Sequence, residues 1–272
     1  MSKATVPTAV VAEGAPEVTP GSTSPRLRRR AQNQFFAFRG TLSKRAQVLT
    51  SICASVFVIA AWEIATRLGW INSLFLPPPS VTAETLWTMI TQKHLLWNAG
   101  ISTLRVWVAF ALSVIMAVPI GIAMSSFRGI GAALEPIVDF IRYLPVPALV
   151  PLSIIWFGVG ETTKIFLLWL GTFFQLVLLV ADDMRRVPQE YVEIAYTVGA
   201  RPFQMLKDVA FRAILPSLFD NLRITLGWCW TYLIIAEIVA ADNGLGFVIW
   251  AARRYMNTSE VMAGVVTIGL IG

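Results

Sequence analysis

Residues 189–209 read QEYVEIAYTVGARPFQMLKDV and form a polar interval between two long apolar runs. Pro188 directly precedes this interval and suits a first helical turn, where its missing N–H does no harm. Gly199 can adopt the left-handed conformation that ends a helix, and Pro202 can start the next helix. The interval therefore predicts two short helices joined by a tight turn.

The second of these predicted helices has an apolar face, with Phe203, Leu206 and Ala210 at helical spacing. An apolar face with charged flanks fits a groove on a partner protein. It equally fits an amphipathic connector that lies on a membrane surface. The residues by themselves leave these two interpretations open.

Outward from this interval, the chain consists largely of apolar runs. It is 56% hydrophobic and 14% charged, whereas a soluble domain is about a quarter charged. Apolar runs of roughly 18 or more residues are typical of membrane spans. We therefore predict an all-α integral membrane protein. Spans are expected at about 48–68, 99–124, 134–157, 165–180 and 222–241.

Two of the apolar runs have special features. The run at 134–157 contains Pro145, Pro147 and Pro151, which are expected to interrupt its helix. The last run, 261–272, would extend only about 18 Å at ~1.5 Å per residue, against a hydrocarbon core of about 30 Å. We therefore expect a sixth span that is truncated at Gly272.

Basic residues predict the orientation in the membrane. Residues 1–46 contain no apolar signal segment and become rich in Arg, which predicts a disordered basic cytosolic tail. Most other basic loop residues fall in 182–212, so the positive-inside rule places the N-terminus and this loop in the cytosol. The rule also accounts for the net charge of +6 without a nucleic-acid partner.

No metal or cofactor site is indicated. The two cysteines, Cys53 and Cys229, fall inside apolar runs, and His94 has no His or Cys partner nearby. None of the five lysines follows a glycine, so a Walker A loop is absent from the sequence. We therefore expect a non-catalytic chain with no cofactor.

The segment 193–216 resembles the "EAA" loop of ABC importer permeases, which reads Glu-Ala-Ala, three residues, Gly, nine residues, and Ile-x-Leu-Pro. Glu193, Ala195 and Gly199 match this motif in identity and spacing, and Ile194 replaces its second residue. The end of the motif departs from the family, because its Leu-Pro is replaced and a Leu-Pro pair follows four residues later, at 215–216.

Other segments resemble the nitrate/sulfonate/taurine/bicarbonate group of these permeases. They are LPPPS at 76–80, WFGVGE at 156–161 and GLG at 244–246. The resemblance implies the type I ABC importer permease fold, with six transmembrane helices per subunit and two subunits around one pathway. Residues 47–272 would then form the transmembrane domain, with a cytosolic coupling loop at about 182–216.

The resemblance also implies partners and roles. The coupling loop would dock into an ABC ATPase subunit, which hydrolyses ATP for the importer. The further partners would be an external substrate-binding protein, a second permease subunit, expected to be an identical copy, and membrane lipid. The residues expected to couple the ATPase to the membrane are Glu193, Ala195, Gly199, Ala200, Phe203 and Leu206.

The function thus predicted is import of a small anion such as nitrate, bicarbonate, a sulfonate or taurine across a bacterial inner membrane. An ion-coupled secondary transporter or channel is the alternative. It predicts coupling acids at the membrane midplane, in which the spans are poor, and it leaves the 182–212 loop unexplained. An intramembrane enzyme would need a His/Asp/Glu cluster, and the sequence of the spans offers none.

Charged residues within the apolar runs are further candidates. Asp139 and Arg142 are three residues apart and share a helix face. We favour a pair that neutralises itself for structural reasons, with an anion pathway near Arg142 as the alternative. Arg105 and Arg223, near span ends, are expected to extend toward the membrane surface. Glu237 resembles a glutamate position of the family, and its role stays open.

Overall fold

The computed structural model describes residues 43–240 and 242–272, and every regular element in them is helical. The all-α class is thus confirmed for this part of the chain. Most of the predicted tail, residues 1–42, lies outside the described residues. The chain divides into two compact units, residues 1–56 and 57–272, and helix α1 (Lys44–Arg67) contributes to both.

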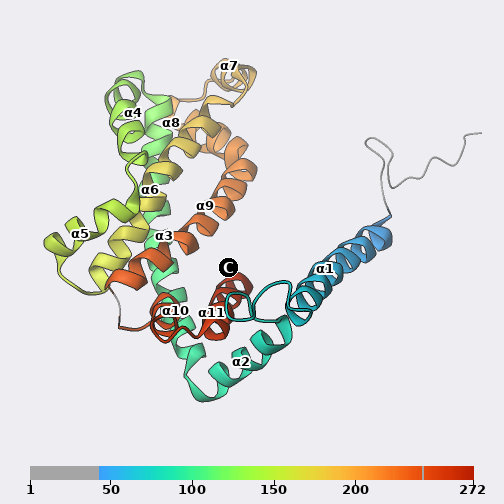
Figure 1. Cartoon of the computed structure of the whole chain (residues 1–272). Coiled ribbons are helices and arrows are strands. Elements are labelled where there is room, and N and C mark those ends of the chain that lie inside the picture. The colour runs from blue at the N-terminus through green and yellow to red at the C-terminus, as the bar shows by residue number, and fades with distance from the viewer. Residues whose placement is uncertain (1–42, 241) are drawn as a thin grey trace, which may run out of the picture. The chain divides into compact units, whose positions relative to one another are not determined.

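Three long helices form the centre of the second unit and lie side by side (Figure 1). They are α3 (Leu95–Ser126), α6 (Glu161–Arg185) and α9 (Phe211–Ala240). Much of their contact is apolar, and side chains such as Leu176 and Leu233 are fully buried. Gly121 of α3 lies so close to α6 that a Cβ there would stand 2.6 Å from the carbonyl oxygen of Val177. Apolar packing therefore places α6 between its two neighbours.

Several described helices are suited to crossing a membrane. Four segments are long and apolar enough, namely α1, α3, α6 and residues 202–239. The pair α4 (Arg128–Arg142) and α5 (Val146–Phe157) qualifies only when taken together. The run predicted as a sixth span corresponds to α11 (Thr258–Ile271), a shorter apolar helix. The prediction of several membrane spans is confirmed, whereas the count of six is not.

The predicted interruption near residue 145 is real, but only one of the three prolines causes it. The chain bends by 100° between α4 and α5, and Pro145 occupies the position directly before α5 with extended backbone angles. Pro147 lies in the first turn of α5, where its missing N–H needs no partner. Pro151 lies inside α5 without ending it.

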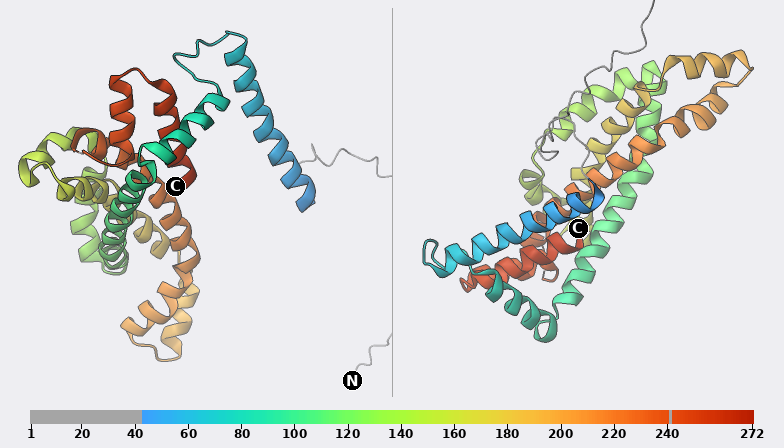
Figure 2. Two further views of the ribbon diagram at one scale, coloured as in Figure 1. Left: turned by 90° about the horizontal axis from the view of Figure 1, so that it is seen from below. Right: turned by 90° about the vertical axis from the view of Figure 1, so that its right-hand side faces the viewer.

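The second unit has two distinct ends, on opposite sides of the three-helix centre (Figures 1 and 2). At one end lie the short elements of the polar interval, which are α7 (Gln189–Thr197), α8 (Pro202–Gln204) and the π-helical η1 (Met205–Ala210). At the other end, α11 packs against α2 (Pro79–Gln92) and α10 (Leu245–Arg254).

Candidate functional site

The polar interval folds as predicted, into two helical segments joined by a tight turn. We call residues 189–210 the α7 hairpin. Gly199 has φ +84°, and the amide of Ala200 donates to the carbonyl of Ala195 over 2.9 Å, which closes the end of α7. Pro202 then occupies the first turn of the next helix. The left-handed Gly199 and the restart at Pro202 are both confirmed.

The second segment of the hairpin is not a separate short helix. It passes through η1 into α9, so that residues 202–239 form one helical segment long enough to span a membrane. The π-helical turn admits one extra residue without breaking the helix, and this is why no loop intervenes. The hairpin is therefore built directly onto the end of a central helix.

Most of the residues predicted for coupling are accessible on the hairpin, but not all. Glu193, Gly199 and Phe203 are exposed, and Phe203 is 72% exposed. Ala200 and Leu206 are half-buried, while Ala195 is 5% exposed and packs inside the hairpin.

The predicted common face of Phe203, Leu206 and Ala210 is wrong, because Ala210 is buried while Phe203 is exposed. The π-helical turn shifts the residues after Met205 out of α-helical register.

Sequence reasoning missed two apolar residues of the hairpin. Ile194 and Val198 are 62% and 79% exposed, and both line a groove between α7 and η1. They lie four residues apart on α7 and its C-terminal cap, so they share one helix face. This spacing in the sequence was a signal that could have identified them.

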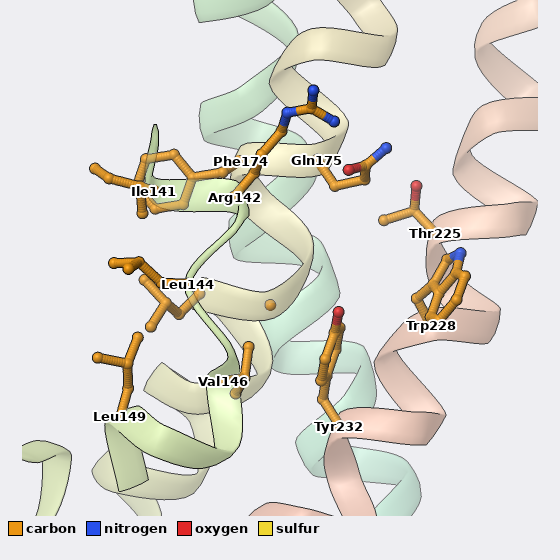
Figure 3. Close-up of a pocket in the computed structure, with 12 residues that line it drawn as sticks. Ile141, Arg142, Leu144, Val146, Leu149, Phe174, Gln175, Thr225, Trp228 and Tyr232 are labelled. Carbon is orange, nitrogen blue, oxygen red and sulfur yellow. The ribbon is translucent and has the colours of Figure 1, made fainter. Parts of the chain in front are cut away.

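A second candidate site lies where the α4–α5 bend meets α6 and α9. We call it the bundle pocket. Its volume is about 230 Å³. Figure 3 shows Gln175, Thr225 and the hydroxyl of Tyr232 directed into the same space, below the guanidinium of Arg142. Gly171 makes room for Tyr232, because a Cβ there would stand 2.5 Å from the tyrosine ring. The apolar wall comes from Leu144, Val146, Leu149, Phe174 and Trp228.

The Asp139–Arg142 pair lies at the edge of this pocket. Arg142 Nε donates to Asp139 Oδ1 over 2.9 Å, and one of its terminal nitrogens donates to the hydroxyl of Tyr143 over 2.8 Å. On this chain the side chain of Arg142 is 29% exposed and that of Asp139 is 45% exposed, so the pair is not buried within the chain. The expected ion pair is therefore formed.

Arg105 does not extend to the membrane surface as predicted. Its side chain is 3% exposed, and its guanidinium is bonded on every side. It donates to both carboxylate oxygens of Glu161 over 2.5 and 2.6 Å, to Glu237 over 2.6 Å, and to Asn243. A buried arginine is tolerable only with such compensation, and partners on α6, α9 and the 242–244 turn supply it.

Glu237 completes this Arg105 cluster. The carboxylate is fully buried and also accepts from the hydroxyl of Ser102 and the amide of Gly246. The two glycines of the GLG segment are required here for space. A Cβ on Gly244 would stand 2.6 Å from Arg105 Nη1, and one on Gly246 would stand 2.7 Å from Glu237 Cβ. The cluster thus holds the start of α10 against α3 and α9.

The family profile described as "Binding-protein-dependent transport system inner membrane component" matches residues 109–272. This chain belongs to that family. The match contains the α7 hairpin, the bundle pocket and the Glu161 and Glu237 carboxylates. The resemblance inferred from the EAA-like segment is thereby confirmed, and the importer permease is favoured over a secondary transporter or an enzyme.

Named relatives support the same assignment for this permease. It is 34% identical to the taurine transport system permease protein TauC of Escherichia coli (strain K12), over 83% of this chain and 84% of that protein. It is 30% identical to the bicarbonate transport system permease protein CmpB of Synechococcus elongatus, over 66% of this chain and 65% of that protein. These relatives are permease components of transport systems.

Solved structures agree in fold. The permease is similar to a chain of the inward-facing MetNI methionine ABC transporter, with a TM-score of 0.57 and 18% identity, over 65% of this chain and 90% of that chain. At this identity the likeness shows the fold alone. It confirms the predicted type I importer permease fold.

The residues of the Arg105 cluster were only partly found from the sequence of the permease. Glu161 and the GLG segment were singled out as family-like, and Glu237 as an open position. Ser102, Asn243 and the buried Lys164, which is 2.8 Å from Glu161, were missed. The partners of Ser102 and Asn243 lie more than 130 positions away in the sequence, so nothing local marks these two. Lys164 lies three residues from Glu161, and this i,i+3 spacing was a signal that could have identified it.

Proposed function

We propose that this permease forms half of the membrane pathway of an ATP-driven importer for a small anion, and that its α7 hairpin is the docking element for an ABC ATPase subunit. The observation that carries this proposal is the hairpin itself. It presents Ile194, Val198 and Phe203 at the end of a helix that continues to residue 239. An exposed apolar surface of this kind, beside charged residues, is typical of a protein-docking site.

The continuity of residues 202–239 suggests how motion reaches the pathway. Residues 202–239 form one helical segment, so displacement of the hairpin would be transmitted to α9 without an intervening loop. Thr225, Trp228 and Tyr232 of the bundle pocket lie on that same helix. Movement of a docked ATPase subunit would therefore be transferred to the pocket without an intervening loop.

The substrate class follows from charge and from the relatives. The bundle pocket carries the guanidinium of Arg142, and no second cation lines it within the described part of the chain. The named relatives transport taurine and bicarbonate. Nitrate, sulfonates and these two solutes are all small and anionic or carry an oxyanion group.

The assembly and its place in the cell complete the proposal. One subunit of this fold supplies half of a pathway, so a second copy is expected, together with two ATPase subunits and an external substrate-binding protein. The basic residues favour a bacterial inner-membrane location with a cytosolic N-terminus. The permease itself would hydrolyse no ATP.

The docking role is tested by a matched pair of substitutions. Val198→Asp places a charge on the hairpin, and Val159→Asp places one on the α5–α6 turn, where the valine is similarly exposed, 74% against 79%. We expect Val198→Asp to lose the ATPase subunit during affinity purification, while Val159→Asp retains it. Equal retention by both variants would contradict the docking role.

The importer function is tested in proteoliposomes that contain the permease, its ATPase and its binding protein. Taurine, bicarbonate and nitrate uptake should each be measured with ATP inside the vesicles, and then with only an ion gradient. We expect uptake of at least one anion with ATP alone. Uptake driven by the gradient without ATP would instead support a secondary transporter.

A further inference from the structure

Three buried side-chain polar groups of the described residues lack a hydrogen-bond partner, and of these Thr225 is the one that lines the bundle pocket; the others are the indole nitrogens of Trp62 and Trp169. Thr225 is 1% exposed, and its hydroxyl has no hydrogen-bond partner among the described residues. Buried hydroxyls are nearly always paired, because an unpaired one loses its hydration without compensation. Thr225 lines the pocket, and Figure 3 shows its hydroxyl directed toward the space beside Gln175. The missing partner would therefore be a bound molecule.

Arg142 has donors left over for the same space. A guanidinium offers five N–H donors. The bonds to Asp139 and Tyr143 account for two of them, and no described residue bonds to Nη1. The Tyr143 ring stacks 4.4 Å from the guanidinium carbon and holds its plane in place. The neighbours of Arg142 thus fix the orientation of its guanidinium but leave some of its N–H donors without an acceptor.

The other donors are neutral. The hydroxyl of Tyr232 and the amide of Gln175 face the pocket beside Thr225 (Figure 3). Arg142 is paired with Asp139 on one edge, and its remaining N–H donors together with several neutral donors suit a group that spreads a negative charge over several oxygens. Of the described residues that line the pocket, Arg142 alone is charged.

The size of the pocket limits its ligand. Its volume of about 230 Å³ is below the range of ~300–1,000 Å³ that is typical of sites for drug-sized molecules. Leu144 and Leu149 lie on the other side of the pocket from Thr225 and Tyr232, whereas Trp228 lies beside these two donors on α9 (Figure 3). A short aliphatic chain attached to an oxyanion would satisfy both sides of the pocket.

We propose that the bundle pocket is an oxyanion-binding subsite of the permease itself, in which Arg142 and the hydroxyls of Thr225 and Tyr232 bind the head of a small sulfonate or carboxylate. This inference rests on the proposed import of a small anion and adds a place and a set of donors to it. Selectivity would then be shared between the external binding protein and the permease.

A labelling experiment tests the subsite without relying on transport. In the permease–ATPase complex, Cys53→Ser and Cys229→Ala remove the native thiols, and Leu144→Cys places one in the pocket wall. The rates of reaction with an anionic sulfonate thiol reagent and a cationic reagent of equal size are then compared. We expect the anionic reagent to be favoured, and its advantage to fall several-fold when Arg142→Gln is added. Taurine should slow the labelling.

Lipid is an alternative source of oxyanions, and the same assay separates it. The labelling is repeated in nanodiscs of phosphatidylcholine alone and with added phosphatidylglycerol. We expect the anionic preference to persist in both. Loss of the preference with anionic lipid would assign the pocket to lipid headgroups and overturn the proposal. The proposal would also be overturned if Arg142→Gln left the ratio of the anionic to the cationic labelling rate unchanged.

A transport measurement then asks whether the unpaired hydroxyl is used. Thr225→Val keeps the shape of the side chain and removes the hydroxyl. Thr267→Val is the matched control, because Thr267 is also buried in a helix but bonds to the carbonyl of Ala263 over 2.8 Å. We expect Thr225→Val to lower taurine-stimulated ATPase activity about tenfold, the factor for one hydrogen bond to a charged group, with normal assembly.

The outcomes separate the two proposals. If the unmodified complex imports none of the tested anions, the proposed function fails. If it imports them while Thr225→Val behaves like Thr267→Val, only the subsite fails.

Discussion

Arg105 and Arg142 occupy similar places in the sequence, since each lies within an apolar helix, but the structure treats them oppositely. Arg105 is 3% exposed and bonds to two carboxylates and an asparagine. Arg142 is 29% exposed and bonds to one carboxylate and a tyrosine hydroxyl. The guanidinium of Arg105 is hydrogen-bonded on all sides, whereas some N–H donors of Arg142 have no partner among the described residues. An arginine with all donors satisfied holds helices together, whereas one with free donors can bind a ligand.

The two ion-pair regions should also contribute differently to the free energy of unfolding, because one is buried and the other is half-exposed. Removing one member of a buried, compensated ion pair leaves an isolated charge and typically costs 3–5 kcal/mol. An ion pair that is half-exposed contributes only about 0–1 kcal/mol. The Asp139–Arg142 pair was expected to matter mainly for folding, and its partial exposure on this chain sets a smaller expected cost than at Arg105. Substitutions at the two arginines should therefore have separable effects.

The largest effect is expected at Arg105. Arg105→Met leaves the fully buried Glu237 without its cation and should lower stability by about 3–5 kcal/mol. The level of permease in the membrane should fall sharply. The double variant Arg105→Met with Glu237→Met removes both charges and should recover part of the loss. Membrane yield and thermal unfolding measure this, and a double variant no better than the single one would refute the pairing.

The next effect is expected at Gly244, which lies beside the same cluster. Gly244 has φ +105°, and a Cβ there would stand 2.6 Å from Arg105 Nη1. Gly244→Ala should therefore destabilise the permease by about 1–3 kcal/mol, through strain and displacement of the arginine. Gly227→Ala is the control, because nothing lies within 4 Å of that Cβ. Equal unfolding temperatures for the two variants would show that the cluster tolerates the change.

The α7 hairpin gives a comparison that involves no buried charge. Gly199 has φ +84° and open space around it, so Gly199→Val adds only backbone strain, of roughly 1–2 kcal/mol. The membrane level should stay near normal, while ATPase association is lost. Gly199→Asn is the control, since asparagine tolerates the left-handed conformation. Normal association and transport in Gly199→Val would mean that the hairpin is only a connector.

The smallest effect on stability is expected at the edge of the bundle pocket. Arg142→Gln and Asp139→Asn should each change the free energy of unfolding by about 0–1 kcal/mol. Anion uptake should be lost in Arg142→Gln and kept in Asp139→Asn, because only the arginine faces the pocket with free donors. Parallel loss of membrane yield in both variants would restore the structural interpretation of the pair.

The sequence by itself determined the features that depend on short-range physics. Apolar runs predicted the membrane helices, and Gly199 and Pro202 predicted the hairpin turn. The prolines at 145, 147 and 151 predicted an interruption, which the structure has at Pro145. Each of these follows from residues within a few positions of one another, because helix length and backbone conformation are local properties. The family, by contrast, was implied by the resemblance of Glu193, Ala195 and Gly199 to a known motif and not by local physics.

Only the tertiary structure decided which charges are satisfied and which are free. The partners of Arg105 are 56, 132 and 138 positions away in the sequence, and packing of α3 against α6 and α9 brings them together. The continuity of α9 through a π-helical turn likewise had no sequence signal that we recognised. Burial and pairing depend on which helix faces meet, and a helical pattern specifies a face but not its neighbour.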